Sequence, residues 1–227
     1  VVIGGRFADQ IDAGDGQNVI LGDSGRLTDA GAAPGTPVRG RIPLGLIESQ
    51  AYFDGGDDSI RSGSGDDIIL GGDAADRIDA AAGDNIVLGD NGRIDFTRRD
   101  RVNSGAQAAD QGAAVIASIE SLSLFEAGGA DTITTLDGDD VVIGGRFADQ
   151  IDAGNGQNVI LGDSGRLTDA GAAPGTPVRG RIPLGLIESQ AYSDGGDDSI
   201  RSGSGDDIIL GGDAADRIDA AAGDNIV

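Results

Sequence analysis

The residues in this sequence that could do chemistry are acidic side chains recurring at a fixed interval. An Asp or Asn stands two residues before an Ile or Val, and this pair repeats every nine residues. The chain has no His and no Cys, which removes the usual zinc ligands and thiol nucleophiles. Regularly spaced carboxylates without such partners favour a hard cation bound through oxygen ligands.

The candidate metal ligands are the polar members of these pairs. They are Asp9, Asn18, Asp58, Asp67, Asp76, Asn85, Asp131, Asp140, Asp149, Asn158, Asp198, Asp207, Asp216 and Asn225. A weaker set stands one residue earlier, at Asp57, Asp66, Asp84, Asp139, Asp197 and Asp206. Asn offers a carbonyl oxygen but no charge, so we expect weaker sites at the Asn positions.

The nine-residue pattern resembles the G-G-x-G-x-D-x-U-x repeat of the RTX family, in which U is a large aliphatic residue. SGSGDDIIL (Ser62–Leu70) and TLDGDDVVI (Thr135–Ile143) carry the resemblance most clearly, while Ala74 and Phe147 stand where the family prefers Gly. The resemblance implies an all-β fold, a parallel β-roll or β-solenoid in which 18 residues complete one turn. It also implies that the bound cation is calcium. It implies type I secretion as well, in which the chain leaves the cell unfolded and folds when it meets external Ca²⁺.

Elementary physics supports this interpretation. A three-residue strand buries its central aliphatic side chain and exposes the two neighbours, and the glycines permit sharp turns. Stacked turns would place Asp58 over Asp76 and Asp131 over Asp149. Two carboxylates about 4.8 Å apart repel by roughly 3 kcal/mol at an effective dielectric of about 20. A shared Ca²⁺ would turn this repulsion into coordination, and one ion for each such pair predicts several per repeat.

The composition narrows the range of partners. The formal charge is −23, and all basic residues are Arg. A charge of this sign argues against nucleic acid and anionic membranes and for cations. No apolar run has the length of about 20 residues that a membrane span needs, so we expect no membrane insertion.

A larger repeat organises the chain. Residues 1–87 recur as 141–227, with Asp15 replaced by Asn155 and Phe53 by Ser193, so the chain is a tandem array of a 140-residue unit. The pattern predicts the end of a β-roll block at 1–27, complete blocks with a terminal hairpin at 54–96 and 128–167, and a partial block at 194–227. Connectors with a capping strand are predicted at 28–53, 97–127 and 168–193.

The predicted hairpin and capping strand have specific signals. Asn91-Gly92 is a turn signal, and Arg93 to Phe96 alternates like a strand that returns along the block. The I-E-S segments, such as Ile119 to Ser121, are expected to cap the first layer of each block. Each block would then be a short roll with closed ends.

Near-identical copies favour a structural role over a unique active site, so we expect no enzyme activity. The expected function is a calcium-stabilised region of a secreted or cell-surface protein, either an adhesin extender or an extracellular matrix filament in a biofilm. Self-association into fibres through exposed strands is a further expectation. The alternatives are a non-catalytic region of a type I-secreted enzyme or toxin, a surface-layer module, or a polysaccharide- or ice-binding module.

Overall fold

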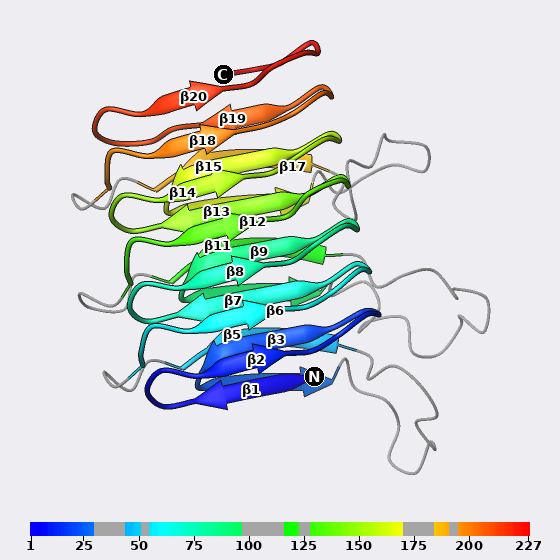
Figure 1. Cartoon of the computed structure of the whole chain (residues 1–227), viewed down its shortest axis with the longest axis vertical. Coiled ribbons are helices and arrows are strands. Elements are labelled where there is room, and N and C mark those ends of the chain that lie inside the picture. Colours follow the sequence, from blue (N-terminus) through cyan, green and yellow to red (C-terminus); the bar gives the residue numbers. More distant parts are fainter. Residues whose placement is uncertain (30–43, 51–54, 97–115, 123–127, 170–183, 191–194) are drawn as a thin grey trace.

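Successive turns of the chain stack in parallel to form a roll, and an additional sheet lies along one side of this roll (Figure 1). The computed structural model describes residues 1–29, 44–50, 55–96, 116–122, 128–169, 184–190 and 195–227. Every helix or strand assigned in these ranges is a strand. The all-β, parallel roll predicted from the sequence is therefore confirmed, whereas much of each predicted connector lies outside the described residues.

Two seven-stranded parallel sheets make the roll. The first parallel sheet consists of β1 (Val2–Gly5), β3 (Val19–Asp23), β7 (Ile68–Gly72), β9 (Ile86–Asp90), β13 (Val141–Gly145), β15 (Val159–Asp163) and β19 (Ile208–Leu210). The second consists of β2 (Gln10–Asp12), β6 (Ser59–Arg61), β8 (Arg77–Asp79), β12 (Thr132–Thr134), β14 (Gln150–Asp152), β18 (Ser199–Arg201) and β20 (Arg217–Asp219). The chain alternates between the two sheets, with a short turn at every crossing except those after β3, β9 and β15, where a longer segment is inserted.

The roll runs without interruption through all the predicted blocks. β3 pairs with β7 at Ile20↔Ile69, and β9 pairs with β13 at Val87↔Val142, although an inserted segment separates the strands of each pair. The expectation of short rolls with closed ends is therefore wrong for the described strands. Each turn offers the next one a full set of backbone donors and acceptors, so stacking continues across an insert once its two ends lie close together.

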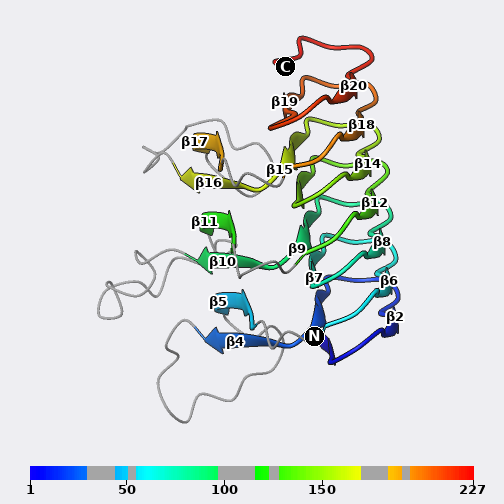
Figure 2. The same ribbon diagram turned by 90° about the vertical axis from the view of Figure 1, so that its left-hand side faces the viewer.

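The inserts build a third, antiparallel sheet beside the roll (Figure 2). Its strands are β4 (Gly25–Asp29), β5 (Leu44–Ser49), β10 (Gly92–Phe96), β11 (Ile116–Ser121), β16 (Gly165–Asp169) and β17 (Leu184–Ser189). β10 pairs with β5 and β11 rather than with β9, because β7 and β13 already occupy both edges of β9. The I-E-S strands likewise pair within this sheet and do not cap the roll. Both local predictions, hairpin and cap, are corrected.

Two apolar layers hold the three sheets together. The predicted periodic aliphatics, such as Ile60, Ile69 and Ile133, fill the interior between the two parallel sheets and are at most 1% exposed. A second layer lies between the first parallel sheet and the third sheet, where Leu70 and Leu88 pack in one cluster with Ile94 and Ile119. The inner strands of the first parallel sheet, from β7 to β15, are therefore buried on both faces, and the neighbours of their central aliphatic are not exposed as predicted.

The spacing of the inserts matches the rise of the roll. Inserts leave the roll after β3, β9 and β15, so two strands are added to the first parallel sheet between successive inserts. Each insert in turn contributes two strands to the third sheet. Because strands in all sheets lie about 4.8 Å apart, the third sheet and the roll advance at the same rate along the stack.

The positions where Ala and Phe replace the family glycine have left-handed backbone. φ is 71° at Ala74 and 70° at Phe147, and it is 67° at Phe7. A left-handed conformation costs a residue with a Cβ about 1–2 kcal/mol. The roll therefore tolerates Ala and Phe at these positions at the cost of local backbone strain. At Phe147 the ring also contacts the Arg146 guanidinium, which lies 5.6 Å from the ring centre.

Candidate metal-binding site

One line of aspartates runs along the edge of the roll where the inserts leave and return. Its members directly precede the strands of the second parallel sheet: Asp9, Asp58, Asp76, Asp131, Asp149, Asp198 and Asp216. The backbone N–H of each aspartate donates to Oδ1 of the next one up the stack, at 2.7 to 3.0 Å. We call this line the insert-edge file. It joins predicted ligands that lie in different repeat blocks.

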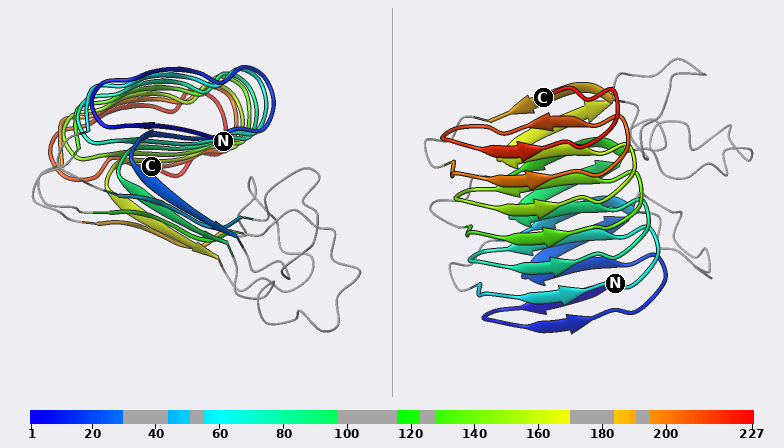
Figure 3. Two further views of the ribbon diagram at one scale, coloured as in Figure 1. Left: turned by 90° about the horizontal axis from the view of Figure 1, so that it is seen from below. Right: turned by 45° about the horizontal axis from the view of Figure 1, so that its top comes forward.

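A second line runs along the opposite edge, which carries no inserts (Figure 3, left). Its members directly precede the strands of the first parallel sheet or, in the last turn, the isolated bridge at Ile226. They alternate Asn with Asp: Asn18, Asp67, Asn85, Asp140, Asn158, Asp207 and Asn225. The same N–H to Oδ1 bonds connect its members at 2.6 to 3.1 Å. We call this line the closed-edge file. All fourteen predicted ligands thus fall into two files, each with one member per turn.

The second oxygen of most of these carboxylates is buried without a hydrogen-bond partner. This applies to Oδ2 of Asp9, Asp58, Asp76, Asp131, Asp149 and Asp198 in the insert-edge file, and of Asp67 and Asp140 in the closed-edge file. The Asn side chains avoid this cost, since Asn85 Nδ2 donates to the carbonyl oxygen of Gly83 at 2.9 Å. A buried acceptor left unpaired costs about 1–3 kcal/mol, and more when it is charged. A cation beside these oxygens would remove the cost.

Burial shifts the acid–base behaviour of the same groups. Desolvation, followed by repulsion from Asp131, raises the pKa of Asp76 to about 10. Desolvation raises the pKa of Asp149 to about 9 and that of Asp140 to about 7. The pKa of Asp131 is raised as well, first by burial and then by the neighbouring Asp90. The protein fold therefore disfavours these negative charges unless a positive charge accompanies them.

Glycine cradles face the unpaired oxygens. A Cβ atom built on Gly71 would lie within 3.0 Å of Asp76 Oδ2 and of the carbonyl oxygen of Gly89. Gly144 has the same relation to Asp149 Oδ2 and to the carbonyl oxygen of Gly162. Only glycine allows the carboxylate and the carbonyl of the next turn to approach so closely. Each turn thus brings two kinds of oxygen ligand together.

This donor set fits calcium. In the described residues, no group of three or more His, Cys, Asp or Glu side chains converges on one point, so a site made of carboxylates alone is absent there. Ca²⁺ accepts six to eight oxygens in flexible geometry, including backbone carbonyls, while Mg²⁺ demands a strict octahedron. The insert-edge and closed-edge aspartates would hold Ca²⁺ together with loop carbonyls, and the ion would supply the charge that the buried carboxylates lack.

The weaker predicted ligands lie farther out on the loops. Asp66 accepts the N–H of Asp84 at 3.2 Å, and Asp84 accepts the N–H of Asp139 at 3.0 Å. Asp57, Asp197 and Asp206 accept backbone N–H groups one turn away, and Asp139 does the same. These carboxylates connect successive loops, and each is more exposed than the file member that directly follows it in the sequence.

Sequence reasoning missed three aspartates at the points where the inserts leave the roll. We call Asp23, Asp90 and Asp163 the exit aspartates. Asp90 accepts the N–H of Gly129, where the chain returns, and the N–H of Arg146 in the next turn, at 2.9 and 2.6 Å. Asp163 binds Gly196 and Asp213 in the same way. The L-G-D segment that ends each of these strands was the available signal.

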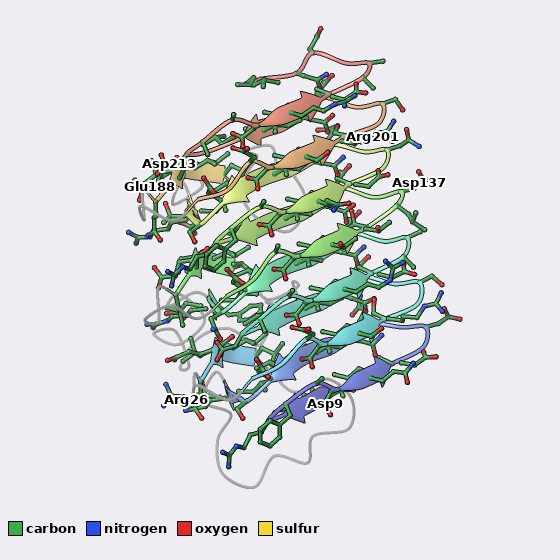
Figure 4. The ribbon with its side chains drawn as sticks, turned by 60° about the vertical axis from the view of Figure 1, so that its left-hand side comes forward. Asp9, Arg26, Asp137, Glu188, Arg201 and Asp213 are labelled. Atoms are coloured by element: carbon green, nitrogen blue, oxygen red, sulfur yellow. The ribbon has the colours of Figure 1, made fainter. Side chains whose placement is uncertain are left out.

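The negative charge is concentrated at the loop edges. On the outer face of the second parallel sheet, four Arg and four Asp balance: Arg61, Arg77, Arg201, Arg217, Asp12, Asp79, Asp152 and Asp219. On the third sheet, Arg26, Glu48, Arg93, Glu120, Arg166 and Glu188 alternate in register. Figure 4 shows Asp137 and Arg201 on one side of the stack and Arg26 and Glu188 on the other. The excess negative charge therefore lies at the loop edges, where the candidate cation ligands stand.

Two observations concern partners other than calcium, namely membranes and ice. The described part of the chain contains no helix with the length and apolarity of a membrane span. The Thr ladder that an ice-binding face would need is also missing from the described strands. Thr132 pairs with Arg77 and Gln150, and Thr134 pairs with Asp79 and Asp152.

Comparison with known proteins agrees with this geometry. A family model described as RTX calcium-binding nonapeptide repeat (4 copies) matches residues 1–26, 54–93, 127–151, 134–166 and 192–227, which together make up more than half of the chain. Neither the curated proteins nor the solved structures include a match to this chain. The matched segments contain both files and the turns that carry them. The chain therefore belongs to the family of RTX calcium-binding nonapeptide repeats.

Proposed function

We propose that this array is a calcium-stiffened, non-catalytic rod that forms the body of an extracellular filament. The observation that supports it best is the insert-edge file, which runs unbroken from Asp9 to Asp216 across three inserts. Because each aspartate bonds to the next, cations bound along the file would tie all turns into one stiff body. Binding would contribute directly to folding stability.

The rise of the roll favours a thick filament over a long-reaching extender. One 140-residue repeat contributes four strands to the first parallel sheet, β1, β3, β7 and β9, before β13 repeats β1. It therefore advances the stack by about 19 Å, whereas 140 extended residues would span roughly 460 Å. A protein whose function is to span a long distance would gain more length from each residue. Three stacked sheets are better suited to resisting bending.

Calcium dependence also suits export. The repulsion within the files would keep the metal-free chain unfolded inside the cell, and millimolar Ca²⁺ outside would fold it. Extracellular calcium modules bind in the range of about 10⁻⁴–10⁻³ M, which matches such a trigger. We therefore place the protein outside the cell or on its surface, after type I secretion.

Scattering and microscopy test this function. In chelator the 227-residue chain should have a radius of gyration of about 50 Å, falling to about 17 Å in millimolar Ca²⁺, with Mg²⁺ as the control. Electron micrographs of the full-length secreted protein should then show rods that lengthen by about 19 Å for each repeat. Equal radii with and without Ca²⁺ would reject the calcium switch. Flexible chains in Ca²⁺ would reject the rod.

A further inference from the structure

The insert-edge file contains two kinds of position that share one geometry. In an uninterrupted turn, the cradle glycine and its aspartate are five residues apart, as in Gly71 and Asp76. At the three places where an insert interrupts the roll, which we call joints, they are far apart in sequence. The joint pairs are Gly22 with Asp58, Gly89 with Asp131, and Gly162 with Asp198. We call Asp58, Asp131 and Asp198 the return aspartates.

The joints reproduce the cradle closely. A Cβ on Gly89 would lie within 3.0 Å of Asp131 Oδ2 and of the carbonyl oxygen of Gly144. The other two joints repeat this relation with the carbonyl oxygens of Gly71 and Gly211. Asp131 is 1% exposed, and its Oδ2 has no hydrogen-bond partner. A return aspartate therefore aims an unpaired buried oxygen at the strand that precedes the insert.

The joints also carry an additional negative charge. Asp90 stands at the end of β9, where the insert begins, and its Oδ1 accepts the N–H of Gly129, two residues before Asp131. Asp163 has the same relation to the third joint, because its Oδ1 accepts the N–H of Gly196, two residues before Asp198. Because both carboxylates belong to one crossing of the chain, closing an insert brings two charges together.

The two edges of the roll differ in a way that follows the inserts. The closed-edge file, whose loops are never interrupted, has Asn at every second turn. The insert-edge file keeps Asp at every turn. Closing a long segment costs more conformational entropy than closing a short loop. Every file position on the insert edge therefore carries a carboxylate. This is the edge where closing an insert costs the most entropy and where a bound cation would stabilise the closed chain most.

We propose that each joint is a divalent-cation site in its own right and that filling it docks the insert onto the roll. The ligands would include the return aspartate and the carbonyl oxygen of the next turn's cradle glycine. The third sheet would then assemble only when the joints are filled, so calcium would control the addition of that layer as well as the roll. This inference rests on the calcium dependence in the proposed function.

A matched pair of variants in the full chain tests the proposal. Asp131→Ala removes a return aspartate, and Asp149→Ala removes the aspartate of the next, uninterrupted turn. Both side chains are 1% exposed, both accept one backbone N–H through Oδ1, and both have an unpaired Oδ2. Hydrogen exchange read by mass spectrometry during a Ca²⁺ titration would follow β10 and β11 separately from β7.

The expected results differ between the two variants. In Asp131→Ala the Ca²⁺ midpoint for protecting β10 and β11 should rise at least about tenfold relative to β7, because a metal site loses a ligand. In Asp149→Ala the insert strands and the roll should remain coupled. Equilibrium dialysis should count fewer bound Ca²⁺ ions in Asp131→Ala than in the unmodified chain. If Asp131→Ala does not fold, Asp58→Ala at the first joint gives the same comparison with β4 and β5.

Three outcomes would overturn the proposal. Identical shifts in the two variants would remove the distinction between joints and ordinary turns. An undiminished ion count in Asp131→Ala would remove the site. Protection of β10 and β11 in chelator, with a roll that still responds to Ca²⁺, would reject the joint sites while leaving the proposed function intact. A roll whose hydrogen-exchange protection does not change with Ca²⁺ would reject both the joint sites and the proposed function.

Discussion

Neutralising part of the insert-edge file should let the roll fold without calcium. The perturbation is the triple variant Asp76→Asn, Asp149→Asn and Asp216→Asn, which leaves the return aspartates unchanged. The closed-edge file shows that Asn fits, because Asn85 Oδ1 accepts the N–H of Asp67 at 3.0 Å just as Asp76 Oδ1 accepts that of Asp58 at 2.8 Å. The new amide nitrogen of residue 76 would also face the carbonyl oxygen of Gly89.

The magnitude follows from the file itself. Its seven members form six neighbouring pairs, and the variant neutralises one partner in five of them. Each pair repels by about 3 kcal/mol at a strand spacing of about 4.8 Å and an effective dielectric of about 20. With all carboxylates ionised, roughly 15 kcal/mol of repulsion is removed, which is as large as the whole stability of a typical domain, about 5–15 kcal/mol. Protonation of Asp76 and Asp149, whose pKa values burial raises to about 10 and about 9, lowers the part of this repulsion that acts at neutral pH.

Far-ultraviolet circular dichroism in chelator at neutral pH is the assay. The unmodified chain should give a coil spectrum and the triple variant a β spectrum, with a weaker response to added Ca²⁺. The control is Asp79→Asn, Asp152→Asn and Asp219→Asn, which changes the same number of charges in the same turns on the outer face of the second parallel sheet. A triple variant that stays unfolded in chelator, or a control that folds equally well, would refute the electrostatic argument.

Three further predictions concern acid, glycine and the third sheet. In chelator the chain should become more stable as the pH falls, because burial raises the pKa of Asp198 to about 7 and that of Asp58 to about 6. Between these pKa values and the value of about 3.9 in the unfolded chain, the metal-free native state binds protons that the unfolded chain does not. Stability is therefore lost as the pH rises from about 4 to about 6 for Asp58 and to about 7 for Asp198, by about 1.4 kcal/mol per pH unit for each proton. A denaturant midpoint that rises with pH would contradict this. Gly144→Ala should destabilise the calcium-loaded roll by about 1–3 kcal/mol or more through overpacking, because the new Cβ meets Asp149 Oδ2 and the carbonyl oxygen of Gly162. An unchanged denaturant midpoint would show that the glycine cradle is not needed. Ile119→Ala, at a fully buried position, should cost about 2–5 kcal/mol, while Ser118→Ala beside it should stay within about 0.5 kcal/mol; equal urea midpoints in saturating Ca²⁺ would contradict the second apolar layer.

Local pattern was sufficient to predict the roll and the placement of the candidate ligands in its turns. The nine-residue spacing of Ile60, Ile69 and Ile78 predicts alternating strands, because only the central residue of each short strand faces the interior. The same spacing places one Asp or Asn at each loop, and the structure gathers all of these side chains into two files. These features depend on contacts within one turn or between adjacent turns, which a periodic sequence encodes directly.

Local pattern failed where a strand had more than one geometrically reasonable partner. Asn91-Gly92 followed by an alternating strand is a hairpin signal, yet neither residue has positive φ and β10 pairs elsewhere. A clue to the true arrangement was present in the strand compositions. Strands such as Ile68 to Leu70 are aliphatic at every position, whereas strands such as Ser59 to Arg61 are apolar only at the centre. The first kind predicts a sheet covered on both faces.

The sequence by itself determined the fold class, the period, the core residues of the roll and the positions of the candidate ligands in the turns, because each is set by neighbours within about 18 residues. Only the tertiary structure decided that blocks join into one roll, that the inserts form a third sheet, and that Asp76 stands next to Asp131 rather than at the end of a block. Those outcomes depend on which free strand edges meet after inserts of many residues have closed. The repeat pattern is identical in form on both sides of an insert, so it cannot by itself specify whether the two sides stack.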